Sequence, residues 1–168
     1  MTKPADNDDF LRVIETNKGI IYKVARAYCK HDEDRQDLIQ EIIIQIWNSF
    51  HKYNDQYRLS TWIYRIALNV AISLYRKNSI RQNMTIPITP EVNYIDDSQT
   101  NEKEGDIVLL YQFIHELNNL DKALMLLYLE QKSYREIADI LDISETNVAT
   151  KIGRVKQIIK QKFLALNK

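Results

Sequence analysis

The chain has few of the residues that break helices or cross-link chains. Its 168 residues include only three glycines, three prolines and one cysteine, Cys29. The scarcity of both helix breakers, together with abundant Ile, Leu, Lys, Glu and Gln, indicates an all-α protein in which strands play little part. A single cysteine excludes an internal disulfide, so the sequence gives no support to an oxidising compartment.

The sequence also lacks a long apolar run, a secretory leader and any excess of charge. No stretch reaches membrane-spanning length, and the opening residues MTKPADNDDF are polar, which favours a cytoplasmic protein. Lys and Arg total 23, as do Asp and Glu, and a formal net charge of zero ordinarily argues against a nucleic-acid binder. The average hides an uneven distribution, because basic blocks at residues 58–89 and 151–168 flank an acidic block at residues 91–106.

Residues 133–156, SYREIADILDISETNVATKIGRVK, have the pattern of a helix-turn-helix. Ser133 and Glu136 have the spacing of a capping box, which predicts the start of a first short helix. Asp142 tolerates the left-handed conformation of a tight turn, and Ser144 offers a second cap for the helix that follows. That second helix has apolar residues at spacings of four and three, which predict one buried stripe: Val148, Ile152, Val155, Ile159, Phe163 and Leu166.

The opposite face of this second helix has groups that suit DNA. Asn147, Thr150, Lys151 and Arg154 are neighbours at helical spacing and can hydrogen-bond base edges or phosphates in a major groove. A polar face opposite an apolar stripe is also what any solvated helix shows. From residue 151 to the end, however, the chain has basic residues and no acidic ones, which favours DNA binding. Gly153 costs about 1 kcal/mol relative to Ala within a helix and is expected to permit close packing.

The first 80 residues are expected to form a three-helix domain. Apolar periodicity runs over residues 10–30, with a break expected at residues 17–19, and resumes after a cap at Asp32. The second helix has a wide apolar band that we assign to the core: Leu38, Ile39, Ile42, Ile43, Ile46, Trp47 and Phe50. Residues 51–58 collect turn formers and are predicted to form a loop before a third long helix.

A second domain is expected over residues 107–168. Residues 81–106 contain two prolines and the acidic block, and they are predicted to form a flexible linker. One helix is expected from Ile107 and another from Ala123, after a cap at Asp121. The predicted fold class is therefore all-α, with two small helical domains, 1–80 and 107–168, joined by a flexible acidic linker. The C-terminal domain ends in the helix-turn-helix.

This order of segments resembles the extracytoplasmic-function (ECF) sigma factors, which are bacterial transcription initiation factors. Residues 34–47, DRQDLIQEIIIQIW, are similar to the family's core-polymerase-binding helix, and residues 60–77, STWIYRIALNVAISLYRK, to its minus-ten recognition helix. Residues 133–156 resemble the helix-turn-helix that reads the minus-thirty-five element, although Asp142 stands where many relatives have Gly. The resemblance spans nearly the whole chain. It implies a dissociable sigma factor that directs core RNA polymerase to specific promoters, aids their opening and needs no cofactor.

The resemblance also assigns roles to individual residues. Binding to the clamp coiled coil of the polymerase falls on one ridge of the second helix: Asp37, Gln40, Glu41 and Ile44. Minus-ten contacts, with a loop that captures a flipped base, fall on Tyr53, Asn54, Arg58, Arg65, Asn69, Ser73, Arg76 and Lys77. Minus-thirty-five contacts fall on Ser133, Tyr134, Arg135, Ser144, Glu145, Asn147, Thr150, Lys151 and Arg154. The implied partners are core RNA polymerase (clamp coiled coil and flap), promoter DNA and an anti-sigma factor, whether free or membrane-anchored, with no small-molecule substrate.

Two other classes of function stay open at this point. An autonomous helix-turn-helix regulator would dimerise and bind its operator tightly without polymerase. An enzyme would need a site such as a metal held by the acidic residues near the start of the second helix: Asp32, Glu33, Asp34, Asp37 and Glu41. The three histidines, His31, His51 and His115, lack metal-ligand spacing, and the sequence has no glycine-rich phosphate loop or nucleophile motif, so we expect no enzyme and no metal.

Overall fold

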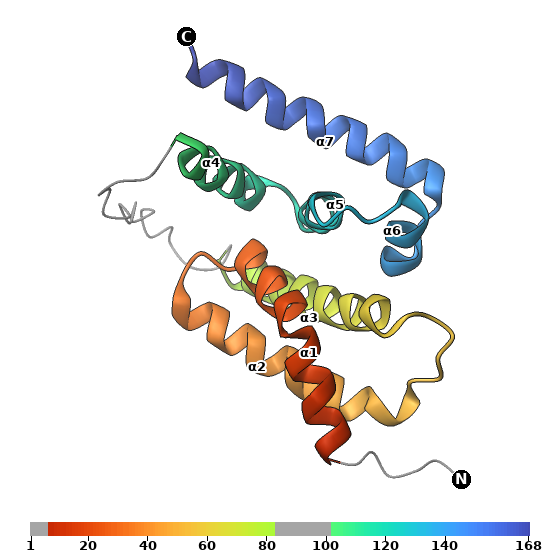
Figure 1. The fold of residues 1–168 in the computed structure, drawn as a ribbon. Helices are drawn as coiled ribbons and strands as arrows, with labels where there is room; N and C mark the ends of the chain where they lie inside the picture. The colour runs from red at the N-terminus through yellow and green to blue at the C-terminus, as the bar shows by residue number, and fades with distance from the viewer. Residues whose placement is uncertain (1–6, 83–101) are drawn as a thin grey trace.

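The computed structural model describes residues 7–82 and 102–168, and every regular element within them is a helix (Figure 1). The all-α class is therefore confirmed. The elements are α1 (Asn7–Tyr28), α2 (Asp32–Ser49), the short 3-10 helix η1 (Phe50–Lys52), α3 (Leu59–Gln82), α4 (Glu102–Glu116), α5 (Asn119–Leu129), α6 (Tyr134–Leu141) and α7 (Glu145–Leu166). None of the helices in these two ranges has the length and hydropathy to cross a membrane.

Helices α1, α2 and α3 pack on one another and form the N-terminal region, residues 7–82. The expected break at residues 17–19 is wrong, because α1 runs through them. The Asn17 amide donates to the Val13 carbonyl at 2.8 Å, inside the helix, and burial of Ile21 and Val24 outweighs the low helix propensity of Gly19. The expected cap at Asp32 is also wrong, since His31 is the N-cap residue of α2 and makes no side-chain capping bond.

Helices α4 to α7 form the C-terminal region, residues 102–168, in which α4, α5 and α6 lie between α7 and the three N-terminal helices (Figure 1). Helix α4 begins earlier than the expected Ile107, because residues 102–106 are helical. Helix α5 also begins earlier than expected, since its cap is Asn118 rather than Asp121. The Asn118 side chain accepts from the Asp121 backbone N–H at 2.9 Å and donates to its carboxylate at 2.8 Å. The rest of the expected linker, residues 83–101, lies outside the described residues.

One apolar core runs through both regions. Its largest cluster joins Ile42 and Ile63 of the N-terminal region to Leu127 and Ile137 of the C-terminal region. A smaller cluster lies within the C-terminal region alone: Phe113, Ile114, Met125, Val155 and Ile159. Helix α5 is buried on all sides, because the six consecutive residues 122–127 are all buried. A helix buried all round needs partners on both sides, and α5 finds them in α7 on one side and in α1 and α3 on the other.

Candidate nucleic-acid interface

Helices α6 and α7, with the turn between them, have the predicted helix-turn-helix geometry. The Ser133 hydroxyl accepts from the Glu136 backbone N–H at 3.1 Å, and the Glu136 carboxylate accepts from the Ser133 N–H at 2.8 Å, so the capping box is complete. The bond from the Ser133 backbone lowers the pKa of Glu136 below its ordinary value. Asp142 ends α6 in the left-handed conformation, with φ 56° and ψ 48°, and Ser144 caps α7 by accepting from the Asn147 N–H at 3.1 Å.

Helix α7 separates an apolar face from a polar one as predicted up to Ile159, but the buried stripe does not reach its expected end, because Phe163 is half-buried and Leu166, in the last turn, is 56% exposed. Val148, Ile152, Val155 and Ile159 are buried, whereas Asn147, Thr150 and Arg154 are exposed and Lys151 is half-buried. The Thr150 hydroxyl donates to the Thr146 carbonyl at 3.0 Å, so its oxygen faces solvent as an acceptor. Acceptors of this kind suit the exocyclic amino groups of adenine and cytosine in the major groove.

The remaining predicted minus-thirty-five residues lie at the N-terminal ends of the same two helices. Tyr134, Arg135 and Glu145 are exposed. Ser133 and Ser144 are exposed too, and because their oxygens accept the capping bonds, their hydroxyl protons are left to donate outward. The close packing expected at Gly153 is wrong: the glycine is exposed, and a Cβ added there would meet nothing within 4 Å.

Helix α3 turns the predicted minus-ten residues outward. Asn69, Ser73 and Arg76 are exposed, whereas Arg65 is half-buried, with its guanidinium 5.1 Å from the centre of the Tyr57 ring. Lys77 belongs to α3, but its side chain lies outside the described residues. A row of polar and basic side chains therefore follows the solvent side of a helix whose other face packs in the core.

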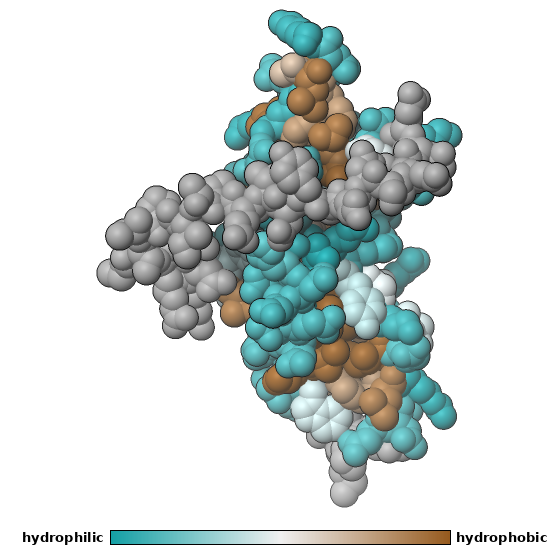
Figure 2. Space-filling model, turned by 90° about the vertical axis from the view of Figure 1, so that its left-hand side faces the viewer, coloured by the Kyte–Doolittle hydropathy of each residue, from teal (hydrophilic) through white to brown (hydrophobic). Residues whose placement is uncertain are grey.

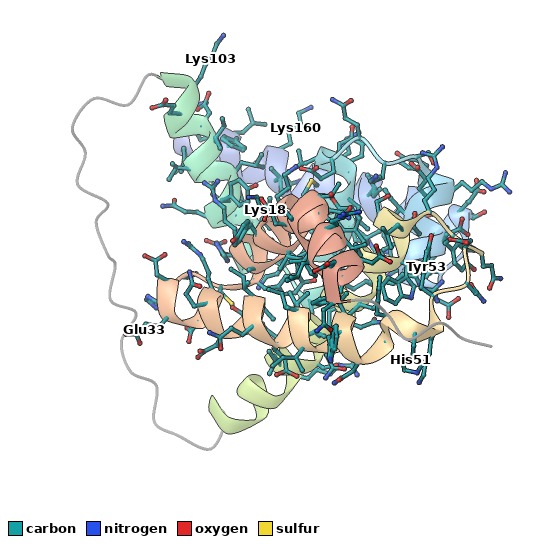
Figure 3. The ribbon with its side chains drawn as sticks, turned by 60° about the horizontal axis from the view of Figure 1, so that its bottom comes forward. Lys18, Glu33, His51, Tyr53, Lys103 and Lys160 are labelled. Carbon is teal, nitrogen blue, oxygen red and sulfur yellow. The ribbon has the colours of Figure 1, made fainter. Side chains whose placement is uncertain are left out.

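The loop before α3 is more ordered than a solvated turn, and it holds two of the predicted residues by specific bonds. The Tyr53 hydroxyl donates to the Tyr57 carbonyl at 2.9 Å, and its ring lies 5.2 Å from that of Trp62. The Asn54 side-chain oxygen accepts from the Gln56 backbone N–H at 3.2 Å, which leaves its amino group to contact a base. Arg58 is exposed. The predicted loop begins two residues later than expected, because His51 and Lys52 belong to η1. Figure 3 shows His51 and Tyr53 at one end of α2 and Glu33 at the other.

Helix α2 presents the predicted polymerase-binding residues on one ridge. Asp37 and Gln40 are exposed, the Ile44 side chain is 50% exposed, and the half-buried Glu41 carboxylate accepts from the Gln45 amide at 3.2 Å. The assignment of Trp47 to the core is wrong, because it is 43% exposed and leans against Phe10 with ring centres 4.8 Å apart. The sequence did not reveal this exposure, because Trp47 follows Ile43 by four residues and so continues the apolar period of the helix.

On the face shown in Figure 2, apolar side chains gather among polar ones both in the lower half of the molecule, which α1 to α3 form, and near its top, in the C-terminal region. Exposed apolar groups that are not scattered singly mark sites of protein–protein contact. By contrast, the described residues contain no group of three or more His, Cys, Asp or Glu side chains that could hold a metal ion.

Two family models match the chain, and they match its two helical regions. Residues 13–80 match the model described as Sigma-70 region 2, and residues 107–159 match the model described as Sigma-70, region 4. The ECF RNA polymerase sigma-E factor of Haemophilus influenzae is 30% identical over 144 residues, which cover 79% of this chain and 76% of the relative. The ECF RNA polymerase sigma factor SigW of Bacillus subtilis is 25% identical, with 96% of this chain and 92% of the relative covered.

Two solved structures share the fold. The sigma factor RpoE in complex with the anti-sigma factor NepR from Bartonella quintana has a TM-score of 0.73 at 14% identity, with 96% of this chain and 99% of that chain covered. CnrH in complex with the cytosolic domain of CnrY has a TM-score of 0.69 at 16% identity, with 96% and 91% covered. Both superpositions take in the N-terminal and the C-terminal region together.

Proposed function

Because the chain belongs to the ECF sigma factors, it is a sigma initiation factor, and we propose that its exposed surfaces divide the binding of polymerase and promoter between them. The curated relatives are sigma factors, which bind polymerase and DNA and are not enzymes. The alternative of an autonomous helix-turn-helix regulator is not favoured, because the chain matches Sigma-70 region 2 as well as region 4, which holds the helix-turn-helix.

The exposed ridge of α2 is the proposed docking surface for the clamp coiled coil of core RNA polymerase. Ile44 and Trp47 offer apolar area for the contact. Asp37 and Gln40 beside them offer a charge and an amide, which would fix how α2 is aligned on the coiled coil. Interfaces of this composition, with an apolar centre and a polar rim, suit protein partners better than nucleic acid. We add Trp47 to the polymerase-binding residues that the resemblance assigns, because it is exposed on the same helix.

Helix α3 and the loop before it are the proposed minus-ten surface. Asn69, Ser73 and Arg76 would contact the backbone and base edges along the helix. In the loop, Asn54 and Arg58 would hold an unstacked base of the non-template strand, next to the aromatic surface of Tyr53. Single-stranded bases bind well to such combinations of ring, amide and cation, so the loop would help to keep the promoter open.

Helices α6 and α7 are the proposed minus-thirty-five reader. Asn147 and Thr150 would contact base edges, while Lys151 and Arg154 would contact phosphates or guanines on the same side of α7. Further proposed partners are the polymerase flap, for the C-terminal region, and an anti-sigma factor. The relatives RpoE and CnrH support the second, since they are bound to NepR and CnrY in their structures. We place the protein in the cytoplasm, where the polymerase works.

The assignment of polymerase to α2 and of DNA to α7 rests on the different composition of the two exposed surfaces. Helix α2 presents apolar groups beside acidic and amide ones, whereas α7 presents basic and amide groups. The first experiment is size-exclusion chromatography of the purified chain with bacterial core RNA polymerase, followed by transcription from the DNA upstream of its own gene. We expect co-elution and new start sites. Tight, salt-sensitive binding to that DNA by the chain alone, without polymerase binding, would contradict the proposal.

The polymerase surface has a matched control within the chain. Ile44→Glu places a charge in the proposed interface and should weaken binding to core polymerase by about 30-fold or more, as loss of a central interface residue does. Ile107→Glu makes the same change at an isoleucine of almost equal exposure, 49% against 50%, on α4. It lies outside the proposed clamp surface, so it should bind the isolated clamp coiled coil like the parent. Equal binding by both variants would remove Ile44 from the interface.

The promoter surface can be divided into residues that select sequence and residues that add affinity. Asn147→Ala should relax the base preference of the holoenzyme at one position of the minus-thirty-five element, with a loss of about 1–3 kcal/mol for the preferred base. Lys151→Ala should weaken binding to all sequences and lower the salt dependence by about one ion. Lys160→Ala, at an exposed residue further along α7, is the control and should do neither.

A further inference from the structure

The loop between η1 and α3 is closed by a bond to Tyr57, a residue without a role so far. The Tyr53 hydroxyl donates to the Tyr57 backbone carbonyl at 2.9 Å, and this bond joins the two ends of residues 53–57, which we call the capture loop. Inside the loop, the Asn54 side-chain oxygen accepts from the Gln56 N–H at 3.2 Å. The capture loop therefore has a defined shape in the chain without DNA.

The tip of the capture loop has a backbone conformation that needs support. Asp55 has φ 59°, in the left-handed region, which is unfavourable for residues other than glycine even though Asp tolerates it better than most. Such a conformation persists where its surroundings fix it. The bond from Tyr53 to Tyr57 spans this residue and supplies that support. Loss of the bond would let the tip of the loop adopt other shapes.

The ring of Tyr57 fixes the capture loop to α3. The Arg65 guanidinium lies 5.1 Å from the ring centre, within the range of a cation–π contact. Both of these side chains are half-buried, whereas Asn54 and Arg58, the proposed contacts of the flipped base, are exposed. Tyr57 thus contacts the protein twice, through its carbonyl and through its ring, and both contacts hold the loop in place.

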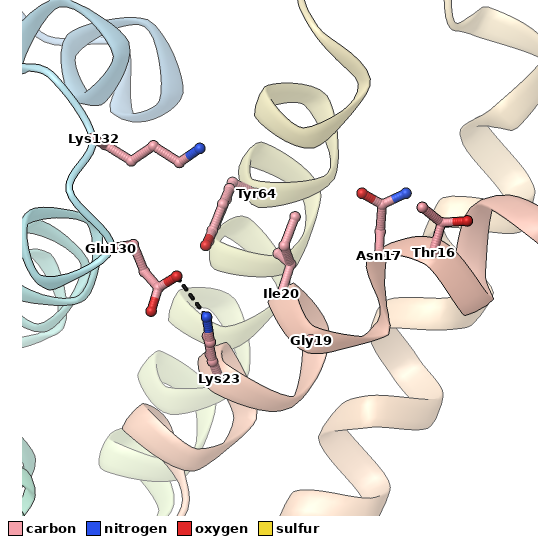
Figure 4. A pocket seen from close by; sticks show the side chains of 8 residues that line it. All are labelled: Thr16, Asn17, Gly19, Ile20, Lys23, Tyr64, Glu130 and Lys132. Carbon is pink, nitrogen blue, oxygen red and sulfur yellow. Dashed lines mark hydrogen bonds and ion pairs between the residues drawn. The ribbon is translucent and has the colours of Figure 1, made fainter.

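The helix to which the loop is fixed is itself held by the core. Ile63 of α3 is fully buried. Tyr64, the neighbour of Arg65, is only 2% exposed and points to a different side of α3, where it lines an open hollow with Ile20 of α1 (Figure 4). Arg65 therefore stands on a rigid element, and the Tyr57 ring against it has a fixed position relative to the core.

A loop that already has its shape loses less conformational entropy when it binds a base. The cost of ordering a backbone is met during folding if the loop is fixed by its own contacts, and it is met during binding if the loop is loose. A shaped loop therefore binds a flipped base more tightly than a loose loop with the same Asn54 and Arg58 side chains. The difference should appear when the promoter opens, because only strand separation presents an unstacked base.

We propose that Tyr57 is a positioning residue for promoter opening, which holds the capture loop through its carbonyl and its ring in the shape that receives the flipped base. Arg65 acts through Tyr57 and does not contact DNA, which revises the minus-ten role that the resemblance gives to it. The inference rests on the proposed function, in which Asn54 and Arg58 hold an unstacked base. It separates the residues that touch the base from those that place them.

The ring contact is tested by Tyr57→Leu, which removes the ring and keeps the carbonyl. Holoenzyme with this variant should open its promoter about 10-fold more slowly, as measured by the permanganate reactivity of unpaired thymines, because the loop must then be ordered during binding. The affinity for the closed, double-stranded promoter should stay the same. Tyr57→Phe restores the ring and should recover opening. Tyr22→Leu makes the same change at an exposed tyrosine of α1 and is the control without effect.

A promoter with mismatched strands at the minus-ten element separates this role from general damage to the protein. The opening step is already complete on that template, so Tyr57→Leu should initiate from it almost as well as the parent does. A damaged protein would stay defective there. Tyr53→Phe removes only the hydroxyl and keeps the ring beside Trp62, and it should slow opening of the paired promoter by about 3-fold, as expected for one lost hydrogen bond.

Arg65→Gln decides whether this arginine acts on the loop or on DNA. If it acts on the loop, the variant should slow opening as Tyr57→Leu does, and the two changes together should be no worse than either alone. The salt dependence of promoter binding should then stay the same. An arginine in contact with phosphate would instead lower that dependence by about one ion, as we expect for Arg76→Gln on the exposed side of the same helix.

Two results would overturn the inference. One is parent-like opening of the paired promoter by Tyr57→Leu while Asn54→Ala, which removes a proposed base contact, slows it. The other is a defect of Tyr57→Leu that is equally large on the mismatched promoter. A lower salt dependence of Arg65→Gln, with an effect that adds to that of Tyr57→Leu, would return Arg65 to the DNA surface. Failure of the parent chain to bind polymerase and open a promoter would instead overturn the proposed function, and the inference with it.

Discussion

The two regions of this molecule define their helices by different means. In the C-terminal region, three of the four helices begin at side chains that cap them: Asn118, Ser133 and Ser144. In the N-terminal region, α2 begins after His31, which makes no side-chain cap, and the three helices share a core of long apolar faces. Side-chain caps mark the starts of helices in one region, whereas in the other α2 begins without such a bond and the helices are held by their shared core.

The exposed surfaces differ in the same way. Helix α2 leaves Ile44 and Trp47 about half exposed, which suits a protein partner. Helix α7 buries Val148, Ile152, Val155 and Ile159 and exposes basic and amide groups, which suit DNA. A single chain thus combines a surface whose composition suits polymerase with one whose composition suits promoter DNA. The predictions below test this comparison through stability.

The largest effect is expected in the core that joins the regions. Ile42 is fully buried in the cluster that continues into α5 and α6, so Ile42→Ala should destabilise the protein by about 2–5 kcal/mol in urea denaturation. Ile44→Ala, one half-turn along the same helix and half exposed, should change stability by about 0.5 kcal/mol or less. We expect circular dichroism and the tryptophan fluorescence of the N-terminal region to give one coincident transition. Two separated transitions would mean that the regions unfold independently.

The next effect depends on pH and on the charges where the regions meet. Burial, with the positive charges of Lys122, Lys30, Arg35 and Arg26, lowers the pKa of His115 to about 4. Between pH 6.5 and 4 the unfolded chain binds a proton that the folded chain does not, so stability falls as the pH is lowered through this window. We expect His115 to account for about 1–2 kcal/mol of that loss after solvent screening.

His115→Gln removes the titrating group and keeps a polar side chain. Its free energy of unfolding, measured in urea between pH 7 and pH 4.5, should decline less than that of the parent by the same amount. An identical decline in both proteins would show that His115 is protonated as readily in the folded chain as in the unfolded one.

A smaller effect separates the capped helices from the uncapped one. Ser133→Ala removes an acceptor from the capping box and should destabilise the protein by about 1 kcal/mol. His31→Ala, at the N-cap of α2, has no side-chain capping bond to lose and should change stability by about 0.5 kcal/mol or less. Thermal unfolding of the two variants checks the difference, and equal losses would remove the distinction between the regions.

The smallest effect should be the same in both regions. Gly19 in α1 and Gly153 in α7 are exposed within helices, and an added Cβ meets nothing within 4 Å at either position. Gly19→Ala and Gly153→Ala should each stabilise the protein by about 0.5–1 kcal/mol, because alanine restricts the unfolded chain and favours the helix. A loss of stability at either residue would reveal a need for glycine that its surroundings do not show.

Prediction from sequence succeeded where the signal was local. Ser133 with Glu136, Asp142 and Ser144 each act on backbone within a few residues, and all adopt the predicted roles. Prediction failed at Trp47 and at residues 17–19, where neighbours far along the chain decide the outcome. Trp47 follows the apolar period of α2 but stays 43% exposed beside the Phe10 ring. Helix α1 stays continuous because its apolar residues are buried against α2 and α3.

The sequence by itself determined the all-α class, the helix-turn-helix and the polar faces of α3 and α7, because periodicity and caps act within single helices. Only the tertiary structure decided that the two regions share a core. The apolar character of α5 on every side was a signal for that contact, but periodicity does not say which surface covers a helix. The burial of Lys122 against Tyr28 and Tyr75 likewise depends on residues more than 40 positions away, which meet only when the chain is folded.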